Sequence, residues 1–415
     1  MIDILAISHA CLTAVNRVIY REFLKNGWSV QLVIPQELAV GEKIKTAEPD
    51  GPSDPIIHRL PLSGLYSRFW KYDGLRELLE RLQPRIILAE SEPGTLIALE
   101  AGRWARNNNA NLVCQSCENM MRGYGSYFVN GNMKGLLSNM VARSLTKLAS
   151  PRIDHIFVIS SDGKKVMEWL GFQERVSQIP LGYDPHLFYL DQNIREETRQ
   201  RLGLHELTFA VFGRMVHEKG IHLLIEALEA FKNKSWQLLL DRFELFHNND
   251  YSQYVKTMIR EKGLESRVVY FDASHAEMPA YMMAADVVVA PSILTPKFKE
   301  QYGRVVPEAM ACGRFVMVSR NGAMPELLGE TGVIFPPNDV HSLVASIERV
   351  FDQPSLLQKL GPEAARRAAR HLSIPKQFEL MASVFQQLSR SSGPQSSDQK
   401  KPEISARLEK ERIPE

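Results

Sequence analysis

The chain of 415 residues lacks a long hydrophobic run, a cysteine framework and an excess of charge of either sign. No run of about eighteen apolar residues occurs, so no transmembrane helix is expected. Four cysteines are too few for a disulfide scaffold in a chain of this length. A net charge of +2 gives no general attraction to nucleic acid. These absences favour a globular cytoplasmic protein with reduced thiols and no nucleic-acid partner.

Motifs for metal or dinucleotide chemistry are also missing. Cys114 and Cys117 have the spacing of a redox or zinc pair, but no second pair or Cys-His cluster accompanies them. His217 and His222 do not fit the H-E-x-x-H zinc motif, because they stand five positions apart with a glycine between them. No D-x-D sequence is present to hold a metal beside a diphosphate, and no G-x-G-x-x-G follows a predicted strand. We therefore expect no metal site and no dinucleotide-dependent dehydrogenase.

Apolar runs alternate with helical patterns along the first half, which is typical of a parallel sheet built from βαβ units. The predicted strands are Ile4–Ile7, Val30–Ile34, Ile56–Leu60, Arg85–Ala89, Asn111–Cys114 and His155–Ile159. The predicted helices are Leu12–Lys25, Tyr72–Leu82, Thr95–Arg106, Leu136–Leu148 and Gly163–Leu170. The chain is too long for one ordinary core, so two domains are expected.

The second half repeats this alternation. Its predicted strands include Thr208–Phe212, Arg267–Phe271 and Phe315–Ser319, with further buried runs around Leu238 and before Pro291. Its predicted helices are Ile221–Phe231, Ser252–Lys262, His275–Met283, Val340–Phe351, Pro362–His371 and Pro375–Ser389. The composition of residues 391–415, rich in Ser, Gln, Lys, Glu and Pro, predicts a disordered tail.

Two glutamates, Glu300 and Glu308, bracket a predicted loop-to-helix junction. The helix is expected to begin near Arg304, to tolerate Pro307 in its first turn and to end at Gly313. On one continuous helix the two carboxylates would diverge, because eight residues at about 100° each overshoot two turns by about 80°. With Glu300 in the loop, both can approach one ligand across the helix N-terminus, whose free N–H groups attract anions.

Two solvated acids near a helix start are the alternative for this pair taken alone. The surrounding order of strand, loop, acid, helix, strand and Gly/Pro turn is that of a doubly wound α/β domain with its ligand at the carboxyl ends of the strands. Arg214 and Lys219 follow the predicted strand Thr208–Phe212 and supply positive charge suited to phosphate oxygens. The alternative for these two cations is a surface ion pair with Glu218 or Glu226.

Four segments resemble motifs of the retaining GT-B glycosyltransferases known as glycosyl transferases group 1. They are the E-x7-E region (300–308), the G-R-x4-K-G segment (212–220), the G-G-x-P-E turn (322–326) and the interdomain N-G-V-D…F segment (181–188). The resemblance is specific from about Gly182 to Pro337 and only topological before Gly182. It implies a hexosyltransferase (EC 2.4) that moves a sugar from a nucleoside-diphosphate sugar to a hydroxyl of a glycan, lipid-linked or small-molecule acceptor, without a metal or other cofactor.

The resemblance also implies a GT-B fold, in which two Rossmann-like, doubly wound parallel-sheet domains face an interdomain cleft and a C-terminal helix crosses back to the first domain. The expected parts are an acceptor-binding domain (1–182), a linker (183–205), a nucleotide-sugar-binding domain (206–374), a crossover helix (375–390) and a tail (391–415).

Residue roles follow from the same resemblance. Glu308 would accept hydrogen bonds from ribose hydroxyls, and Glu300 would bind hydroxyls of the donor sugar near the reacting face. Arg214 and Lys219 would neutralise the departing diphosphate in place of a metal. No covalent nucleophile is implied, because members of the family are thought to retain configuration by attack on the same face. The other expected donor-binding residues are Gly213, Gln301, Tyr302, Gly303, Arg304 and Val305.

The acceptor side departs from the family pattern. The loop after the first strand lacks the glycine pair that relatives often carry, and no histidine follows Asn111–Cys114, where many members place one near the reacting sugar. Gln115 or Glu118 is a candidate replacement, and the alternative is that they belong to a polar loop without a chemical role. The Gly- and Tyr-containing loop Gly123–Gly131 follows them. The remaining acceptor-side candidates are His9, Asn16 and Arg17, in a helix that Thr13 is expected to cap.

Residues 132–150 combine apolar residues at helical spacing with Lys134, Arg143 and Lys147 and contain no acid. A helix packed on the sheet with a basic outer face fits this pattern, and an interfacial membrane helix is the alternative. The expected location is the cytoplasm, with peripheral contact at the inner face of the cell membrane as an open alternative. The sequence does not set the oligomeric state.

Two other functions are open: another GT-B enzyme, such as a nucleotide-sugar epimerase, and a catalytically silent nucleotide-sugar-binding subunit. No residues match an epimerase, and a silent subunit would be expected to have lost Glu300 or Glu308. A glycogen-type phosphorylase would need a lysine for pyridoxal phosphate and a far longer chain. The sequence leaves the donor sugar, the base and the linkage undetermined, since Leu238–Glu244 replaces the glycine-rich turn that commonly helps to hold the nucleotide.

Overall fold

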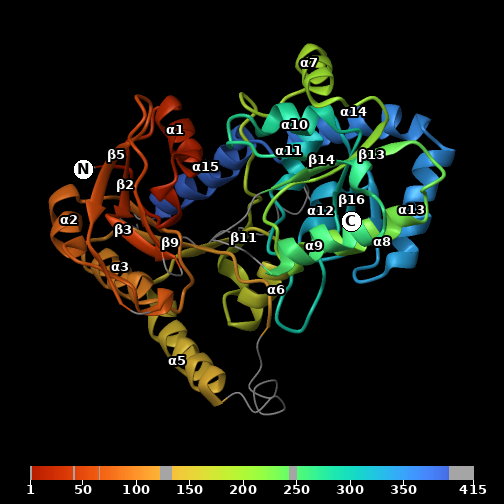
Figure 1. Ribbon diagram of the computed structural model, residues 1–415. Helices are drawn as coiled ribbons and strands as arrows, with labels where there is room; N and C mark the ends of the chain where they lie inside the picture. Colours follow the sequence, from red (N-terminus) through yellow and green to blue (C-terminus); the bar gives the residue numbers. More distant parts are fainter. Residues whose placement is uncertain (1, 41–42, 65, 122–132, 243–249, 392–415) are drawn as a thin grey trace. The chain divides into compact units, whose positions relative to one another are not determined.

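The computed structural model describes residues 2–40, 43–64, 66–121, 133–242 and 250–391 (Figure 1). It divides into two compact units, one formed by residues up to Pro180 together with the helix that begins at Ile374, and one formed by Leu181–Ser373. Three predicted features lie partly or wholly outside the described residues: the loop 123–131, the end of the segment 238–244 and the tail 391–415. No helix within the described ranges is long and apolar enough to span a bilayer.

The first unit is built on a parallel sheet of seven strands in the order β11-β10-β9-β8-β1-β2-β5. The strands are β1 (Ile4–Ile7), β2 (Val30–Pro35), β5 (Ile56–Leu60), β8 (Ile86–Ala89), β9 (Asn111–Ser116), β10 (His155–Val158) and β11 (Val176–Gln178). Because β1 pairs with β2 on one side and β8 on the other, the direction of winding reverses between β1 and β8. In doubly wound sheets ligands bind at the carboxyl ends of the strands beside such a switch point.

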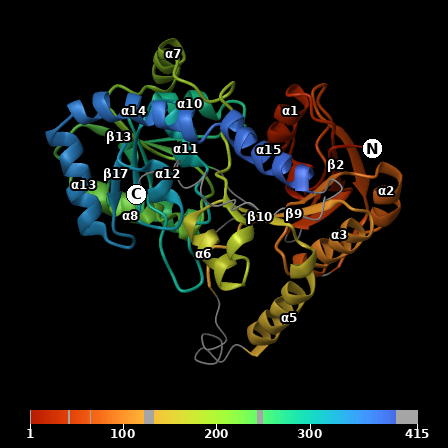
Figure 2. The same cartoon turned by 180° about the vertical axis from the view of Figure 1, so that it is seen from behind.

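Alternate strand residues of the first unit face two helical layers. The helices are α1 (Val18–Lys25), α2 (Leu75–Leu82), α3 (Leu96–Asn107), α5 (Met133–Ala149), α6 (Ser161–Trp169) and α15 (Ile374–Ser391). Leu5 and Ile7 share a core with α2, α3 and α6, whereas Ile4 and Ala6 share a core with α1 and α15. Figure 2 shows α15 beside α1. The C-terminal helix therefore packs on the first unit, as expected.

Two helix predictions in the first unit are wrong at their N-terminal ends. Thr13 is extended and separates two 3-10 turns, η1 (Ala10–Leu12) and η2 (Ala14–Arg17), from each other, so the α-helix expected from Leu12 begins at Val18. Thr13 caps nothing, because its hydroxyl accepts a hydrogen bond from Lys45 Nζ at 2.5 Å. The helix expected from Tyr72 begins at Leu75.

The remaining elements of the first unit are short. Two antiparallel pairs lie outside the main sheet: β3 (Glu37–Val40) with β4 (Lys43–Thr46), and β6 (Leu62–Ser63) with β7 (Lys71–Tyr72). Further 3-10 turns are η3 (Ser67–Phe69), η4 (Ser150–Arg152) and η5 (Gln173–Arg175). All four cysteines are free thiols, so Cys114 and Cys117 form no disulfide.

The second unit has a six-stranded parallel sheet in the order β14-β13-β12-β15-β16-β17. The strands are β12 (Leu207–Val211), β13 (Trp236–Asp241), β14 (Val268–Phe271), β15 (Val287–Ala290), β16 (Phe315–Ser319) and β17 (Val333–Phe335). The helices and 3-10 turns are α7 (Gln192–Leu202), η6 (His217–Lys219), α8 (Ile221–Glu229), α9 (Asp250–Glu261), η7 (Glu265–Arg267), α10 (Met278–Ala284), α11 (Val305–Ala311), α12 (Met324–Leu328), α13 (Val340–Asp352) and α14 (Ser355–His371). Here the switch point lies between β12 and β15.

Residues 183–205, expected as a linker, lie within the second unit and contain α7. Asp191 caps this helix by accepting hydrogen bonds from two main-chain N–H groups. Arg195 and Arg199 both pair with the carboxylate of Asp286, next to the start of β15. The charges of this stretch therefore anchor the helix to the sheet.

The helix expected from Pro362 begins seven residues earlier, at Ser355, and Pro362 lies inside it. A proline inside a helix costs about 3 kcal/mol, because it removes a hydrogen bond and clashes with the preceding turn. The apolar residues before it, Leu356, Leu357 and Leu360, pack on the core of the second unit, and their burial offsets that cost.

Candidate functional site

The loops that follow β12 and β15 meet at the switch point of the second unit. Gly220 ends the turn η6 with a φ of 66°, and a Cβ there would lie 2.1 Å from the carbonyl oxygen of Pro291. Only glycine avoids this clash and adopts the left-handed conformation without strain. The close approach places Lys219, on the first loop, against Ser292, on the second.

Lys219 and Ser292 both bind Glu300. Lys219 Nζ donates to Glu300 Oε2 at 2.7 Å, and Ser292 Oγ donates to the same oxygen at 2.9 Å. The lysine and glutamate side chains retain only 21% and 11% of their exposure. Residues 81 positions apart in the sequence thus form a partly buried ion pair. The alternative pairing of Lys219 with Glu218 or Glu226 is wrong.

The main chain of Glu300 is fixed as firmly as its side chain. Its N–H donates to Oδ1 of Asn321 at 3.1 Å, and Nδ2 of that asparagine donates to the carbonyl of Ile293 at 2.7 Å. Gly322 has a φ of 58°, and a Cβ on it would lie 1.7 Å from the carbonyl oxygen of Glu300. The glycine turn at 321–322 therefore holds the loop that carries Glu300. Such support keeps a ligand-binding carboxylate in one orientation.

Glu308 lies in the first turn of α11, which begins at Val305 after Arg304 and is followed by Gly313 with a φ of 69°, close to the predicted bounds. Burial raises the pKa of Glu308 to about 7, although Arg304, with Nε 3.8 Å from Glu308 Oε1, opposes that rise. Glu300 and Glu308 are each 8% exposed. Two solvated acids near a helix start, the alternative for this pair, are therefore excluded.

The other expected donor-side residues differ in their exposure to solvent. Arg214 is exposed and makes no ion pair with any residue the structure describes. Gly213 has a φ of 113°, and its N–H donates to Asp241 Oδ2 at 3.4 Å. Tyr302 is buried, and its hydroxyl donates to the carbonyl of Leu181 at 2.6 Å, so this side chain stabilises the unit.

Four further donor-side residues lie between the two acids. Gln301 and Arg304 are exposed, and Val305 is half-buried at the start of α11. Gly303 has a φ of 81°, and a Cβ on it would lie 2.8 Å from Cγ of Met324. Its conformation and the packing of Met324 therefore both require glycine.

In the first unit Arg17 does not have the role expected of it. Its side chain is fully buried, and its guanidinium forms an ion pair with Asp54 at 2.9 Å and donates to the carbonyls of Cys11 and Glu48. A guanidinium whose donors all point into the protein cannot bind an acceptor. Arg17 is therefore a structural residue, and its assignment to the acceptor side is corrected.

The remaining acceptor-side candidates stay at the carboxyl edge of the first sheet. The ring of His9 packs edge-on against Trp70, with centroids 5.2 Å apart, and burial lowers its pKa. Asn16 Nδ2 donates to the carbonyl of Ala10 at 2.8 Å. Gln115 and Glu118, in and after β9, are half-buried.

Two glutamates at this edge were missed by the sequence analysis. Glu90 follows β8 and accepts a hydrogen bond from Ser8 after β1, so the pair straddles the switch point. Glu92 accepts hydrogen bonds from the hydroxyl of Ser116 and, at 3.0 Å, from the N–H of Cys117. Burial raises the pKa of both carboxyls, that of Glu92 to about 7. Two acids directly after a buried strand were the signal that could have identified them.

Residues 194–367 match the family model described as glycosyl transferases group 1. We refer to this segment as the group 1 domain, after the family model that it matches. It contains the Lys219–Glu300 ion pair, the buried Glu308 and the switch point between β12 and β15.

Several curated relatives of this domain are named as glycosyltransferases. The D-inositol 3-phosphate glycosyltransferase of Corynebacterium glutamicum is 29% identical over 206 residues, which cover 47% of this chain and 48% of the relative. The GDP-mannose-dependent alpha-(1-6)-phosphatidylinositol monomannoside mannosyltransferase of Mycolicibacterium smegmatis is 28% identical, over 45% of this chain and 50% of that protein. The chain spans about half the length of the curated relatives it matches.

Solved structures extend the likeness to both units. HepE of Anabaena, crystallised with UDP, has a TM-score of 0.72 and 19% identity, covering 93% of this chain and all of HepE. Sucrose-phosphate synthase of Thermosynechococcus elongatus has a TM-score of 0.70 and 20% identity, covering 94% of this chain and all of that chain. The expected GT-B class, with two Rossmann-like parallel sheets, is confirmed.

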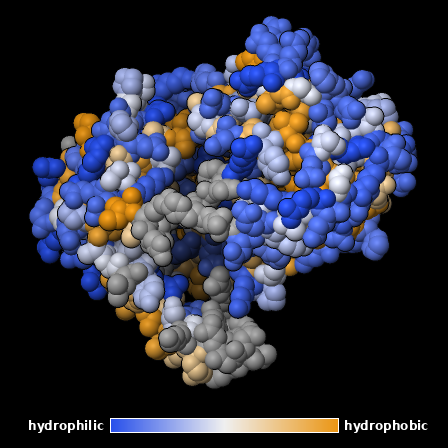
Figure 3. Space-filling model, in the orientation of Figure 1, coloured by the Kyte–Doolittle hydropathy of each residue, from blue (hydrophilic) through white to orange (hydrophobic). Residues whose placement is uncertain are grey.

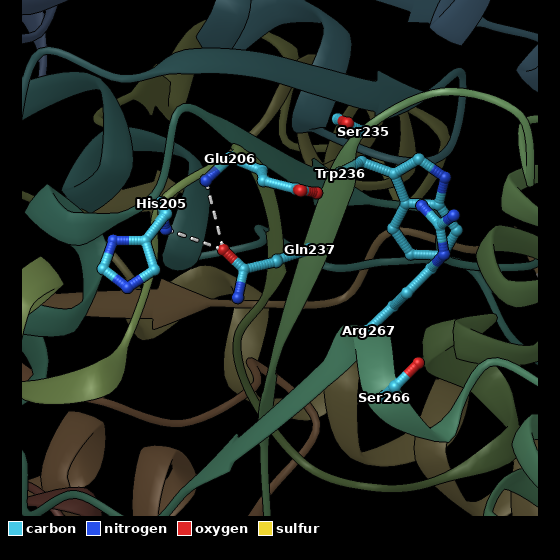
Figure 4. Close-up of a pocket in the computed structure, with 7 residues that line it drawn as sticks. All are labelled: His205, Glu206, Ser235, Trp236, Gln237, Ser266 and Arg267. Atoms are coloured by element: carbon cyan, nitrogen blue, oxygen red, sulfur yellow. Dashed lines mark hydrogen bonds between the residues drawn. The ribbon is translucent and has the colours of Figure 1, made fainter.

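A pocket of about 300 Å³ lies at the opposite edge of the group 1 domain, at the amino ends of β12, β13 and β14 (Figure 4). Gln237 Oε1 accepts hydrogen bonds from the N–H groups of His205 and Glu206, and Arg267 donates to two carbonyls while lying over the ring of Trp236. These polar groups are used within the protein, and ligands of doubly wound sheets bind at carboxyl edges. The Lys219–Glu300 edge therefore remains the candidate site.

Glu308 gives the group 1 domain a pH-dependent stability that the variant Glu308→Gln should lack. Its pKa of about 7 in the folded protein exceeds the ordinary 4.5. The stability that the neutral carboxyl confers is therefore full below about pH 4.5 and is lost as pH rises through about 7, a change of roughly 3 kcal/mol. Without ligand, the melting temperature of the wild type should fall between about pH 5 and about pH 8. The melting temperature of the variant should fall by several degrees less.

The matched control for this prediction is Glu330→Gln, which alters an exposed acid of the same unit. It should reproduce the pH dependence of the wild type. Equal pH dependence in Glu308→Gln and the wild type would mean that Glu308 is ionised throughout this range.

Proposed function

We propose that the chain is a retaining glycosyltransferase that moves a hexosyl group from a nucleoside-diphosphate sugar to a hydroxyl of a glycan, lipid-linked or small-molecule acceptor. The observation that carries this proposal is the partly buried Lys219–Glu300 ion pair at the switch point of the group 1 domain. It joins a cation suited to phosphate with a carboxylate suited to sugar hydroxyls, at the edge where such sheets bind ligands.

The roles divide between charge and orientation. Lys219 and the exposed Arg214 neutralise the diphosphate as the bond between its oxygen and the anomeric carbon breaks. Glu300 accepts hydrogen bonds from hydroxyls of the donor sugar, and Glu308 accepts them from the ribose. The acceptor oxygen forms the new bond on the same face of the sugar, and its proton passes to the departing phosphate oxygen.

The likeness to HepE supports a nucleotide donor, because HepE has been crystallised with UDP and with UDP-glucose. The two curated relatives carry names that refer to an inositol phosphate and to a phosphatidylinositol monomannoside, which keeps soluble and lipid-linked acceptors within the proposal. On the acceptor side we assign Glu92, beside Gln115 and Glu118, as a further group that can bind the reacting hydroxyl.

The test is a panel of nucleoside-diphosphate sugars, screened by thermal shift and by release of the nucleoside diphosphate. One or a few donors should raise the melting temperature, since binding to the folded state adds stability. The same donors should release nucleoside diphosphate slowly to water and faster with an acceptor. A silent binding subunit would show the thermal shift without any release, and a nucleotide-sugar epimerase would interconvert sugars and leave the diphosphate bound to them.

Turnover should not require a divalent metal. The chain has no D-x-D sequence, and Arg214 and Lys219 supply fixed positive charge in its place. Activity in excess chelator should stay within about twofold of activity in magnesium. Complete loss in chelator, with recovery on addition of magnesium or manganese, would contradict the assignment of these two residues.

A further inference from the structure

Helix α5 of the first unit exposes a row of apolar side chains. Met133, Leu137, Met140 and Leu148 are 62%, 64%, 49% and 55% exposed. Their spacing of four, three and eight positions places them on one face of the helix. Hydrophobic surface is visible where α5 lies, at the lower left of Figure 3. Single exposed apolar residues are common, whereas a row of four on one helix face indicates a binding surface.

Other residues of α5 pack on its own unit. Leu136 and Ala149 are 6% and 0% exposed, and Leu145 packs against the core that contains α3. The prediction of a packed helix is correct for these residues. The outer side is basic only in part, because Leu137 and Leu148 are exposed there together with Lys147.

Positive charge surrounds the apolar row. The segment Met133–Ala149 contains no acidic residue, and Lys147 is exposed beside Leu148. Arg152 donates to the carbonyl of Leu148 at the C-terminal end of the row. Arg68 lies beside the middle of the helix, where its Nη1 donates to the carbonyl and the hydroxyl of Ser138 at 3.2 and 3.1 Å.

We propose that this face of α5 binds the surface of a bilayer that contains anionic phospholipids. Apolar side chains enter the boundary between headgroups and acyl chains, and lysine and arginine remain at the negatively charged headgroups. An acid-free helix with an exposed apolar row and flanking cations has both features. The helix lies on the membrane and does not cross it, in agreement with the absence of a membrane-spanning helix among the described residues.

Charge decides against a second copy of this chain as the occupant. A two-fold symmetric contact would place the same face of α5 on both sides of the interface. Arg68, Lys147 and Arg152 of each copy would then meet their equivalents without an acid from α5 to neutralise them. An anionic lipid surface supplies the negative charge that the α5 segment of a second copy lacks.

The experiment is flotation of the full chain with phosphatidylcholine vesicles that contain about 30% phosphatidylglycerol, compared with vesicles of phosphatidylcholine alone. The wild type should float with the anionic vesicles, float poorly with the neutral ones, and dissociate as salt is raised to about 0.5 M. This experiment measures binding to vesicles and not sugar transfer. A chain that does not bind vesicles could still transfer a sugar, and a chain without transfer activity could still bind vesicles.

Two variants separate the apolar and the charged contributions. L137S/M140S removes two apolar side chains and should weaken binding by more than roughly 30-fold. K147Q/R152Q keeps the apolar row and should weaken binding to anionic vesicles roughly 30-fold, at about 1 kcal/mol per charge. Ile56→Ser is the matched control, because Ile56 is 63% exposed on β5 of the same unit and should leave binding unchanged.

Each outcome decides the proposal. Loss of binding in both double variants, with melting temperatures and nucleoside-diphosphate release unchanged, supports it. No flotation of the wild type overturns it. A dimer that is lost in L137S/M140S, without lipid binding, overturns it in favour of a second copy. Equal loss in Ile56→Ser would show that binding is not specific to α5 and would also overturn it.

Discussion

Glu300→Gln is expected to lower kcat by roughly 10²-fold while changing KM for the donor far less. The carboxylate is held by Lys219 and Ser292 through one oxygen, and its main chain is held by Asn321. Such a group is already oriented when charge develops at the anomeric carbon, and removing one oriented charge typically costs about this factor. Because glutamine keeps the shape and one acceptor oxygen, the donor still binds.

Glu308→Gln provides the contrast within the same site. If Glu308 binds the ribose equally in the ground state and the transition state, its loss should mainly raise KM for the donor. Glu330→Gln, on the exposed surface of the same unit, should leave both constants unchanged. A wild-type kcat in Glu300→Gln would show that this residue has no catalytic role. Equal increases of KM in both variants, with unchanged kcat, would mean that both glutamates bind the donor and that their roles do not differ.

The second large effect is expected at the cations. Lys219→Met should lower kcat/KM by roughly 10²- to 10³-fold, because it removes a fixed charge at the departing diphosphate. It should also lower the free energy of unfolding by about 2 kcal/mol, since a partly buried carboxylate loses a charged hydrogen-bond partner at 2.7 Å. Steady-state kinetics and chemical unfolding of the same preparation measure both effects.

Arg214→Met is the matched comparison for Lys219→Met. Arg214 is exposed and forms no ion pair with the described residues, so its loss should lower kcat/KM while stability changes by less than about 0.5 kcal/mol. Lys219→Arg keeps the charge on a larger, planar group and should recover stability better than activity. Normal activity in both Met variants would show that neither cation contacts the diphosphate.

The sequence predicted the architecture well because most strands of both sheets are apolar runs. All six strands expected in the first half are present, and the C-terminal helix packs on the first unit as expected. The errors share one physical cause, which is that tertiary packing overrides local signals. Pro362 suggested a helix start, but burial of the leucines before it extends α14 through the proline.

The candidate site was predictable in its residues and not in its contacts. The spacing of Glu300 and Glu308 located the loop-to-helix junction, but nothing local shows that Lys219 pairs with Glu300. That contact depends on adjacent strands at a switch point, which is a property of the whole sheet. Arg17 illustrates the opposite error. A basic residue after a first strand suggested a ligand contact, but two of its partners, Glu48 and Asp54, lie 31 and 37 positions away.

The most direct test of the proposed function is proton NMR of the reaction, in excess chelator, with the donor identified by the panel and an acceptor. We predict that the α-anomeric signal of a donor such as UDP-glucose disappears and that the first product carries an α-anomeric signal. Retention of the α configuration in excess chelator would agree with attack on the same face of the sugar. It would also agree with fixed cations that take the place of a metal at the Lys219–Glu300 edge. A β-configured first product, or a donor that binds and is never consumed, would contradict the account.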